Sequence, residues 1–439
     1  IRKSIKKTKK IKKKFTSAQF EHIKEKINFN LTKDQLNAIN DINNDLSSDR
    51  KMFRLLQGDV GSGKTIVALI CCLNVISSNF QAGFMAPTEI LANQHYNLAK
   101  QLFGKKIIVK LLTSKTDYSE RKKILDDLKN NKIDLLVGTH SLFQEKIIYH
   151  SLGLIIIDEQ HKFGVKQRKK LSDKGGKNCD VLVMSATPIP RTMIMTIFGD
   201  MDVTILKGKP KNRKDIKTYS KIENKINDVI KFVSEKIIKK NQIFWVCPLI
   251  EESKKVDHQS SVKRYENLKK KFNNRVGLLH GLLEKEEKNK ILSDFLNKKI
   301  DILVSTTVIE VGIDFPNATV IIIENANKFG LSQLHQLRGR VGRGLEQATC
   351  ILLYKNNLSE NARKRIKILK SSNDGFFIAD EDMKLRGFGD LLGFKQSGIK
   401  TFRLADPIQN EDLIILAEKE IKKIENENKK LYIYRPLIK

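Results

Sequence analysis

Cysteine is scarce in this sequence of 439 residues, and none of its five cysteines belongs to a C-x-x-C pair. The five positions are Cys71, Cys72, Cys179, Cys247 and Cys350. An odd number of cysteines, with no histidine at metal-ligand spacing, argues against a disulfide framework and against a zinc site. We therefore expect a reduced compartment such as the cytosol.

Long apolar runs are also absent. Runs such as Leu152 to Ile157 and Thr319 to Ile323 fall far short of the roughly 18 residues that a membrane span requires. The first fourteen residues hold nine Lys or Arg and no acid, without the apolar core of a signal peptide. The sequence therefore predicts no membrane partner, and residues 1–28 are interpreted as a basic remnant of a truncated or processed start.

Acidic residues are too few to balance the basic ones. Against 82 Lys and Arg stand 50 Asp and Glu, which gives a formal net charge of +32. Such a positive field suits a polyanionic partner, with nucleic acid first and an anionic membrane second. Because a lysine-rich composition can also reflect an AT-rich coding sequence, the charge by itself only favours nucleic acid.

Short aliphatic runs alternate with amphipathic stretches from about Leu55 onward. In the first half, buried parallel strands are predicted at Phe53 to Gln57, Ala82 to Ala86, Leu135 to Gly138, Leu154 to Ile157 and Val181 to Met184. Helices are predicted between them at Thr65 to Ser77, Glu89 to Leu102 and Tyr118 to Asn130. This alternation predicts a doubly wound α/β domain, which we place at residues 29–208.

A basic segment interrupted by Pro210, residues 207–217, predicts a linker to a second domain. The strands predicted after it are Gln242 to Val246, Arg275 to Leu279, Ile300 to Ser305, Thr319 to Glu324 and Thr349 to Tyr354, with helices at Ile226 to Ile238 and Glu286 to Asn297. We place this second α/β domain at residues 215–370. The glycine-containing remainder, residues 371–439, predicts a small helical region.

The segment after the first predicted strand reads G-x-x-x-x-G-K-T and runs into a predicted helix, which is the context of a P-loop. Its glycines, Gly58, Gly61 and Gly63, let backbone amides turn toward a phosphate. Lys64 can reach the β and γ oxygens of a nucleotide, and the Thr65 hydroxyl can ligate Mg²⁺. The alternative is a chance glycine-rich turn.

Asp158 and Glu159 follow the buried run Leu154 to Ile157, at what would be the carboxyl edge of the sheet. Asp158 can hold the Mg²⁺ ion while Glu159 orients and deprotonates the attacking water. Two adjacent acids can instead form a solvated turn. Beside a P-loop, the catalytic interpretation is favoured.

Three of the few arginines, Arg338, Arg340 and Arg343, lie within six residues of the second domain. In a lysine-rich chain this choice indicates bidentate phosphate contact, because the planar guanidinium is a fork that Lys lacks. Such a cluster can supply an arginine finger to a bound nucleotide. The alternative is contact with a nucleic-acid backbone without catalysis.

The P-loop, D-E-Q-H (158–161), S-A-T (185–187) and Q-L-R-G-R-V-G-R (336–343) occur in this order and resemble the motifs of superfamily-two helicases. The strings MAPTEILANQHY, GTHSLFQ, IIDEQHKFGVKQR and TTVIEVGID are similar to those of the RecG family. The resemblance implies an α/β fold of two tandem RecA-like P-loop domains with parallel sheets that sandwich ATP. It also implies that most of the family's N-terminal wedge domain is absent from this sequence.

The resemblance further implies roles for single residues. It implies that Gln35 recognises adenine, with Phe29 stacking nearby. It also implies that Arg340 and Arg343 are the arginine fingers, with Gln336 beside them, and that Gly312 and Asp314 contact ATP from the second domain. The residues implied to contact the DNA backbone are Thr88, Thr139 and Thr306. Arg386 and Gln396 match a translocation motif that the family shares with the transcription-repair coupling factor.

The function implied is that of an ATP- and Mg²⁺-dependent double-stranded DNA translocase of the bacterial cytosol and nucleoid. Its partner would be duplex or branched DNA, at stalled replication forks and Holliday junctions, in recombination and repair. An RNA helicase is an alternative, because a fold does not fix its substrate. A second alternative is a catalytically silent nucleic-acid scaffold, against which the intact Lys64, Asp158 and Glu159 argue.

Overall fold

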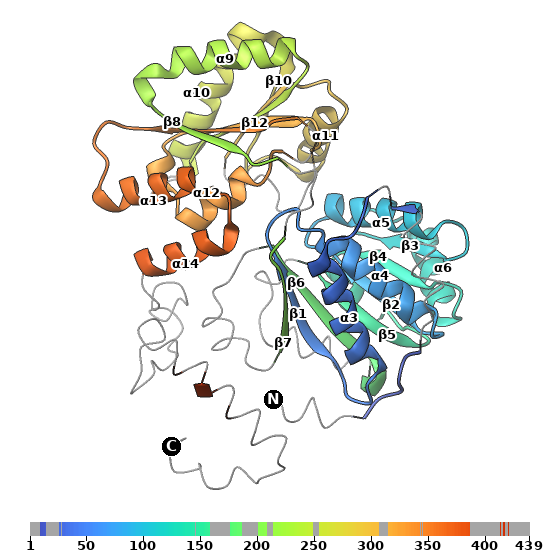
Figure 1. The fold of residues 1–439 in the computed structure, drawn as a ribbon. Helices are drawn as coiled ribbons and strands as arrows, with labels where there is room; N and C mark the ends of the chain where they lie inside the picture. The colour runs from blue at the N-terminus through green and yellow to red at the C-terminus, as the bar shows by residue number, and fades with distance from the viewer. Residues whose placement is uncertain are drawn as a thin grey trace. The chain divides into compact units, whose positions relative to one another are not determined.

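The computed structural model describes residues 9–14, 26–27, 29–144, 146–158, 176–186, 201–208, 214–248, 254–306, 315–342, 344, 346–386, 413, 416–417 and 420. The chain divides into two compact units, Ile1–Pro188 with Asp200–Ile378, and Ile189–Gly199 with Ala379–Lys439. The larger unit holds two parallel sheets (Figure 1). Among the described residues, no helix combines the length and the apolar character that crossing a bilayer requires.

The first sheet has seven strands in the order β3-β4-β2-β5-β6-β1-β7. They are β1 (Phe53–Gly58), β2 (Gln81–Met85), β3 (Val109–Leu112), β4 (Leu135–Gly138), β5 (Leu152–Ile157), β6 (Asp180–Ser185) and β7 (Asp202–Leu206). Every neighbouring pair is parallel. Because parallel strands need crossover connections, helices cover the sheet, and every residue of β5 is buried.

The helices of this domain are α3 (Lys33–Ser47), α4 (Lys64–Ile76), α5 (Glu89–Phe103) and α6 (Tyr118–Lys129), with 3₁₀ turns η1 (His140–Phe143) and η3 (Gly176–Asn178). Helix α4 is apolar for most of its length, and eleven of its residues are buried. It packs between α3 and the sheet (Figure 1). The core therefore lies directly behind the segment that joins β1 to α4.

The second sheet has six parallel strands in the order β10-β11-β9-β12-β13-β8. They are β8 (Lys217–Ile222), β9 (Gln242–Val246), β10 (Val276–Leu279), β11 (Ile302–Ser305), β12 (Ala318–Ile323) and β13 (Thr349–Tyr354). The helices are α9 (Ile226–Ile238), α10 (Lys254–Phe272), α11 (Lys285–Leu296), α12 (Leu331–Arg338), α13 (Glu360–Ser371) and α14 (Gly375–Arg386), with 3₁₀ turns η4 (Glu223–Lys225), η5 (Asn273–Arg275) and η6 (Ala326–Lys328).

The predicted fold class, two tandem RecA-like domains with parallel sheets, is confirmed. The predicted strands coincide with observed strands to within one or two residues. Strands β3, β7 and β8 and helices α3, α10, α12 and α13 were not predicted. Strand β8 begins at Lys217, the last residue of the predicted linker, and its lysines at a sheet edge hide it from a search for apolar runs.

Candidate nucleotide-binding site

The sequence-predicted site residues of the first domain gather at one edge of its sheet. Gly58 ends β1, Thr88 follows β2, Thr139 follows β4 and Asp158 follows β5. Because all seven strands are parallel, their carboxyl ends share this edge. Open α/β sheets bind ligands in the crevice outside that edge, so the topology alone brings these residues to a ligand-binding position.

The loop between β1 and α4 has the backbone that a phosphate cradle requires. Gly61 and Gly63 adopt φ angles of 77° and 87°, in the left-handed region that side chains with a Cβ rarely occupy. Gly63 is the N-cap of α4, and no side chain caps the helix there. The amides at the positive end of the helix therefore point where an anion binds.

Lys64 is buried, and its Nζ atom donates to two carbonyl oxygens of the same loop. It lies 2.8 Å from Gly58 O and 3.0 Å from Asp59 O. The ammonium is thus held at the centre of the loop by acceptors that phosphate oxygens can replace. Nucleotide binding by Lys64 stays a prediction.

Gln35, predicted to recognise adenine, braces the loop. Its Nε2 atom donates to Ser62 O at 2.9 Å, and its Oε1 atom accepts from Thr32 N at 2.8 Å in a capping box that begins α3. The side chain is 1% exposed. Phe29, its predicted stacking neighbour, is 43% exposed, so its ring is accessible for stacking. Support of the P-loop is therefore a second role for Gln35, which the sequence did not indicate.

Asp158 is positioned by a histidine that the sequence analysis missed. The Oδ2 atom of Asp158 lies 3.0 Å from His95 Nε2, and both residues are buried. A carboxylate only accepts, so His95 carries a proton on Nε2 and donates it. His95 comes from α5, and its ring packs on Phe84 of β2 with centroids 4.6 Å apart. The only sequence signal was its place within MAPTEILANQHY.

The oxygen donors at this edge fit Mg²⁺. Thr65 lies in the first turn of α4 and Asp158 follows β5, so a hydroxyl and a carboxylate are available. Among the described residues, no group of three or more His, Cys, Asp or Glu is arranged to hold a metal. Mg²⁺ is usually held by one or two protein oxygens together with substrate phosphates and water, so a hydroxyl and a carboxylate fit it.

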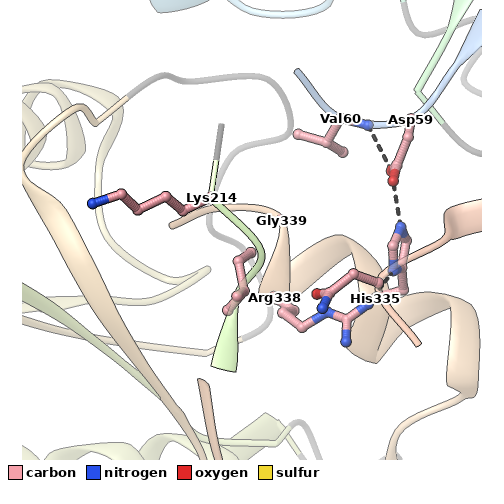
Figure 2. Close-up of a pocket in the computed structure, with 8 residues that line it drawn as sticks. Asp59, Val60, Lys214, His335, Arg338 and Gly339 are labelled. Carbon is pink, nitrogen blue, oxygen red and sulfur yellow. Dashed lines mark hydrogen bonds and ion pairs between the residues drawn. The ribbon is translucent and has the colours of Figure 1, made fainter. Parts of the chain in front are cut away.

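In the second domain, Arg338 makes structural contacts. Its guanidinium is 1% exposed and donates to Leu369 O at 2.6 Å and Ser372 O at 2.9 Å. Its Nη2 atom lies 3.0 Å from His335 Nδ1 (Figure 2). Burial lowers the pKa of Arg338 from its ordinary value. Of the three clustered arginines, this one joins α12 to the end of α13, and it also lines the pocket drawn in Figure 2.

The remaining predicted residues differ in how far the structure describes them. Arg340 is 5% exposed, and Gln336 is partly buried in α12. Arg386 is the last residue of α14, without a described side chain. Glu159, Gly312, Asp314, Arg343 and Gln396 lie outside the described residues.

The three threonines predicted to contact DNA follow strand ends. Thr88 is the N-cap of α5 and accepts from Leu91 N at 3.3 Å, so it has a structural role as well. Thr139 is partly buried before η1. The Thr306 hydroxyl, at the end of β11, is buried and has no hydrogen-bond partner among the described residues.

Comparison with known families agrees with this geometry. Residues 32–196 match the DEAD/DEAH box helicase family, residues 224–344 the helicase conserved C-terminal domain, and residues 372–433 the C-terminal part of domain 3 of ATP-dependent DNA helicase RecG. The first match covers strands β1 to β6 of the first sheet, and the second covers strands β9 to β12 of the second sheet.

Individual relatives are more specific. ATP-dependent DNA helicase RecG of Thermotoga maritima is 46% identical over 430 residues, which are 97% of this chain and 55% of the relative. The RecG of Bacillus subtilis is 45% identical over 403 residues, 91% of this chain and 59% of the relative. A solved structure of RecG bound to a three-way DNA junction has 43% identity and a TM-score of 0.80, covering 94% of this chain and 54% of that chain. The chain thus spans little more than half the length of these relatives.

Proposed function

Because this chain belongs to the RecG family of superfamily-two helicases, we propose that it uses ATP hydrolysis to move along double-stranded DNA and to remodel branched DNA. Stalled forks and Holliday junctions are the proposed substrates, in recombination and repair. The observation that carries the proposal is the P-loop, with Lys64 held at its centre and Asp158 fixed by His95 at the same sheet edge. A place in the bacterial cytosol, on the nucleoid, follows from a DNA substrate.

The proposed domain division is 29–208 for the first RecA-like domain, 215–370 for the second and 371–439 for the translocation region, after a basic segment at 1–28. Lys64 and the loop amides bind the triphosphate, and Gln35 supports the loop while contacting adenine. Mg²⁺, held through Thr65 and Asp158, would neutralise charge on the transferred phosphate.

Hydrolysis then depends on residues from both domains. Glu159 orients and deprotonates the attacking water. Arg340 and Arg343 stabilise the charge that develops on the γ-phosphate, with Gln336 beside them, while Gly312 and Asp314 contact the nucleotide. Such a transition state needs positioning and charge neutralisation more than covalent chemistry. Closing and reopening of the two domains would alternate the grip on DNA.

The grip itself is proposed to come from Thr88, Thr139 and Thr306. Their hydroxyls follow strand ends, where short polar groups can meet phosphate oxygens. Arg386 and Gln396 are proposed to couple the nucleotide cycle to movement. The net charge of +32 favours a polyanionic track without base recognition.

The experiment that tests movement compares two activities of one variant. Arg386→Ala should retain substantial DNA-stimulated ATP turnover while losing displacement of the third strand from a triplex. Lys384→Ala is the matched control, because Lys384 lies on the same helix and is exposed, with its Nζ paired to Glu381 at 2.7 Å. A full-length RecG such as that of Thermotoga maritima serves as the positive control.

If Arg386→Ala and the parent displaced the third strand equally per ATP hydrolysed, the proposed translocation motif would be only a glycine-containing loop. Loss of both activities would make it a structural support. Strand separation of RNA duplexes, with no response to DNA, would favour the RNA helicase. Binding of DNA with no ATP turnover would favour the silent scaffold.

A further inference from the structure

The P-loop is joined to helix α12 by one hydrogen bond that lies outside the assigned roles. His335 Nε2 and Asp59 Oδ1 are 2.8 Å apart, although the residues are 276 positions apart in the chain (Figure 2). Both belong to the larger compact unit, and both are buried. The same Oδ1 atom accepts from Val60 N at 2.7 Å, so the carboxylate is fixed relative to the loop backbone.

The partners of His335 determine which way this hydrogen bond runs. Arg338 Nη2 lies 3.0 Å from His335 Nδ1, and a guanidinium only donates. Nδ1 is therefore the acceptor, and Nε2 carries the proton that His335 donates to Asp59. Two successive hydrogen bonds therefore run in one direction: Arg338 donates to His335, and His335 donates to the carboxylate of Asp59 in the P-loop. Each member is held at both ends.

Asp59 connects this sequence of contacts to the phosphate-binding lysine. Its carbonyl oxygen accepts from Lys64 Nζ at 3.0 Å while its side chain accepts from His335. The same carbonyl oxygen also accepts from Ser62 N at 3.1 Å, so a phosphate that draws Lys64 away removes one of several contacts that hold Asp59. The position of the Asp59 side chain, and with it His335, then depends on what Lys64 binds.

The same residues also lie next to the beginning of α14. Arg338 donates to Leu369 O in the last turn of α13 and to Ser372 O at its C-cap, just before the short connection to α14. The first residue of α14, Gly375, packs so tightly on the pair that a Cβ there would lie 2.7 Å from His335 Nε2 and 2.8 Å from Asp59 Cγ. Only glycine allows this approach. Helix α14 ends at Arg386, where the proposed translocation motif begins.

We propose that Asp59 and His335 are positioning residues that couple the phosphate-binding loop to the start of helix α14. The inference rests on the proposed function, since it supplies a physical route from ATP to the region that contains Arg386. Lys64 binds the nucleotide and contacts Asp59, so a shift of Lys64 changes the position of Asp59. His335 is bonded to Asp59, so the shift then reaches α12 and α14. The alternative is a purely structural role, in which the buried polar pair only holds the P-loop and α12 together.

Two substitutions of His335 separate these possibilities. His335→Gln keeps an N–H donor at the distance of Nε2, so it can still bond Asp59. His335→Asn keeps an acceptor near the position of Nδ1 for Arg338 but is too short to reach Asp59. These variants are matched in polarity and differ in which contact survives. Asp59→Asn keeps the acceptor, and Asp59→Ala removes it.

The first measurement is steady-state ATP turnover of the full chain with duplex DNA. We expect His335→Asn and Asp59→Ala each to lower kcat about tenfold with less than about twofold change in KM for ATP, because a coupling contact is typically worth 5- to 150-fold. His335→Gln and Asp59→Asn should stay within about threefold of the parent. The double variant, Asp59→Ala with His335→Asn, should be no slower than either single variant.

The second measurement needs no turnover. The amides of Phe376 and Phe377, which Asp374 Oδ1 accepts at the start of α14, report the position of that helix in hydrogen exchange. A non-hydrolysable ATP analogue should change their exchange in the parent and in His335→Gln, and leave it unchanged in His335→Asn. The control is the double variant Asp126→Ala with His150→Ala, which removes one Asp and one His that are both exposed in the first domain. It tests whether losing such residues anywhere changes the exchange.

The inference would be overturned if the decreases in kcat of the two single variants multiplied in the double variant. A rise in KM without a fall in kcat would also overturn it. So would an analogue response in His335→Asn equal to that of the parent. If the parent hydrolyses ATP without any response to DNA, the proposed function fails instead, and the exchange experiment still decides the coupling.

Discussion

His95 Nε2 lies 3.0 Å from Asp158 Oδ2, so a helix of the first domain orients the carboxylate proposed to hold Mg²⁺. His95→Ala should raise the Mg²⁺ concentration for half-maximal ATP turnover about tenfold, because partners that orient a metal ligand typically contribute 10- to 100-fold. His95→Gln should recover part of the loss through its amide donor. Equal Mg²⁺ titrations for the parent and both variants would show that the contact has no such role.

Asp180 is expected to be a strong determinant of stability in the first domain. Its carboxylate accepts from Lys10 Nζ at 2.7 Å, Lys13 Nζ at 2.6 Å and Met52 N at 2.7 Å, and both ion pairs are fully buried. Asp180→Ala leaves two buried ammonium groups without their partner. Losing one member of a buried ion pair typically costs 3–5 kcal/mol, and we expect an effect of about that size.

The measurement is hydrogen exchange at Met52, whose amide should exchange faster in Asp180→Ala. Asp127→Ala is the control, because Asp127 pairs at 3.9 Å with Lys132, which is 70% exposed. Such a surface pair contributes at most about 1 kcal/mol. Equal protection of Met52 in Asp180→Ala and the parent would contradict the account.

The thiols are expected to be unreactive in the folded chain. All five cysteines are buried, and burial raises the pKa of Cys179 and of Cys350 to about 12. Because the thiolate is the nucleophile, raising the pH to 8.5 should not start labelling by a thiol reagent, whereas denaturant should expose all five groups. Rapid labelling of the folded chain at that pH would show that these sites open readily.

DNA binding should depend steeply on salt. A chain of net charge +32 that neutralises several phosphates releases counterions, and each contact contributes about −0.9 to the slope of log K against log salt. We expect a slope steeper than about −4 and little preference among sequences. A flat salt response, or tight binding to one sequence alone, would argue against backbone recognition.

The sequence predicted those features that local patterns encode. Apolar runs predicted the central strands, and the spacing of Gly58, Gly63 and Lys64 predicted the P-loop. The contacts of His95 with Asp158 and of His335 with Asp59 join residues 63 and 276 positions apart, so no local pattern encodes them. They depend on which strands and helices the topology places side by side.

The basic N-terminal segment shows the same limit. Nine of the first fourteen residues are Lys or Arg, and from the sequence alone the segment is interpreted as a basic remnant. Lys10 and Lys13 are instead buried in the first domain, where both form ion pairs with Asp180 at the start of β6. Composition cannot distinguish a lysine in water from one with a buried carboxylate 170 residues away.

The most direct test of the central claim is ATP turnover of this chain with and without branched DNA, in the parent and in Lys64→Ala. Exposed Lys122→Ala is the control for loss of one positive charge. The account predicts Mg²⁺-dependent turnover that branched DNA accelerates about tenfold or more, and a fall of about 100-fold or more in Lys64→Ala, since the electrostatic stabilisation from one donor is typically worth 10²–10³. Turnover by Lys64→Ala at the parental rate, or a parent that DNA does not accelerate, would contradict it.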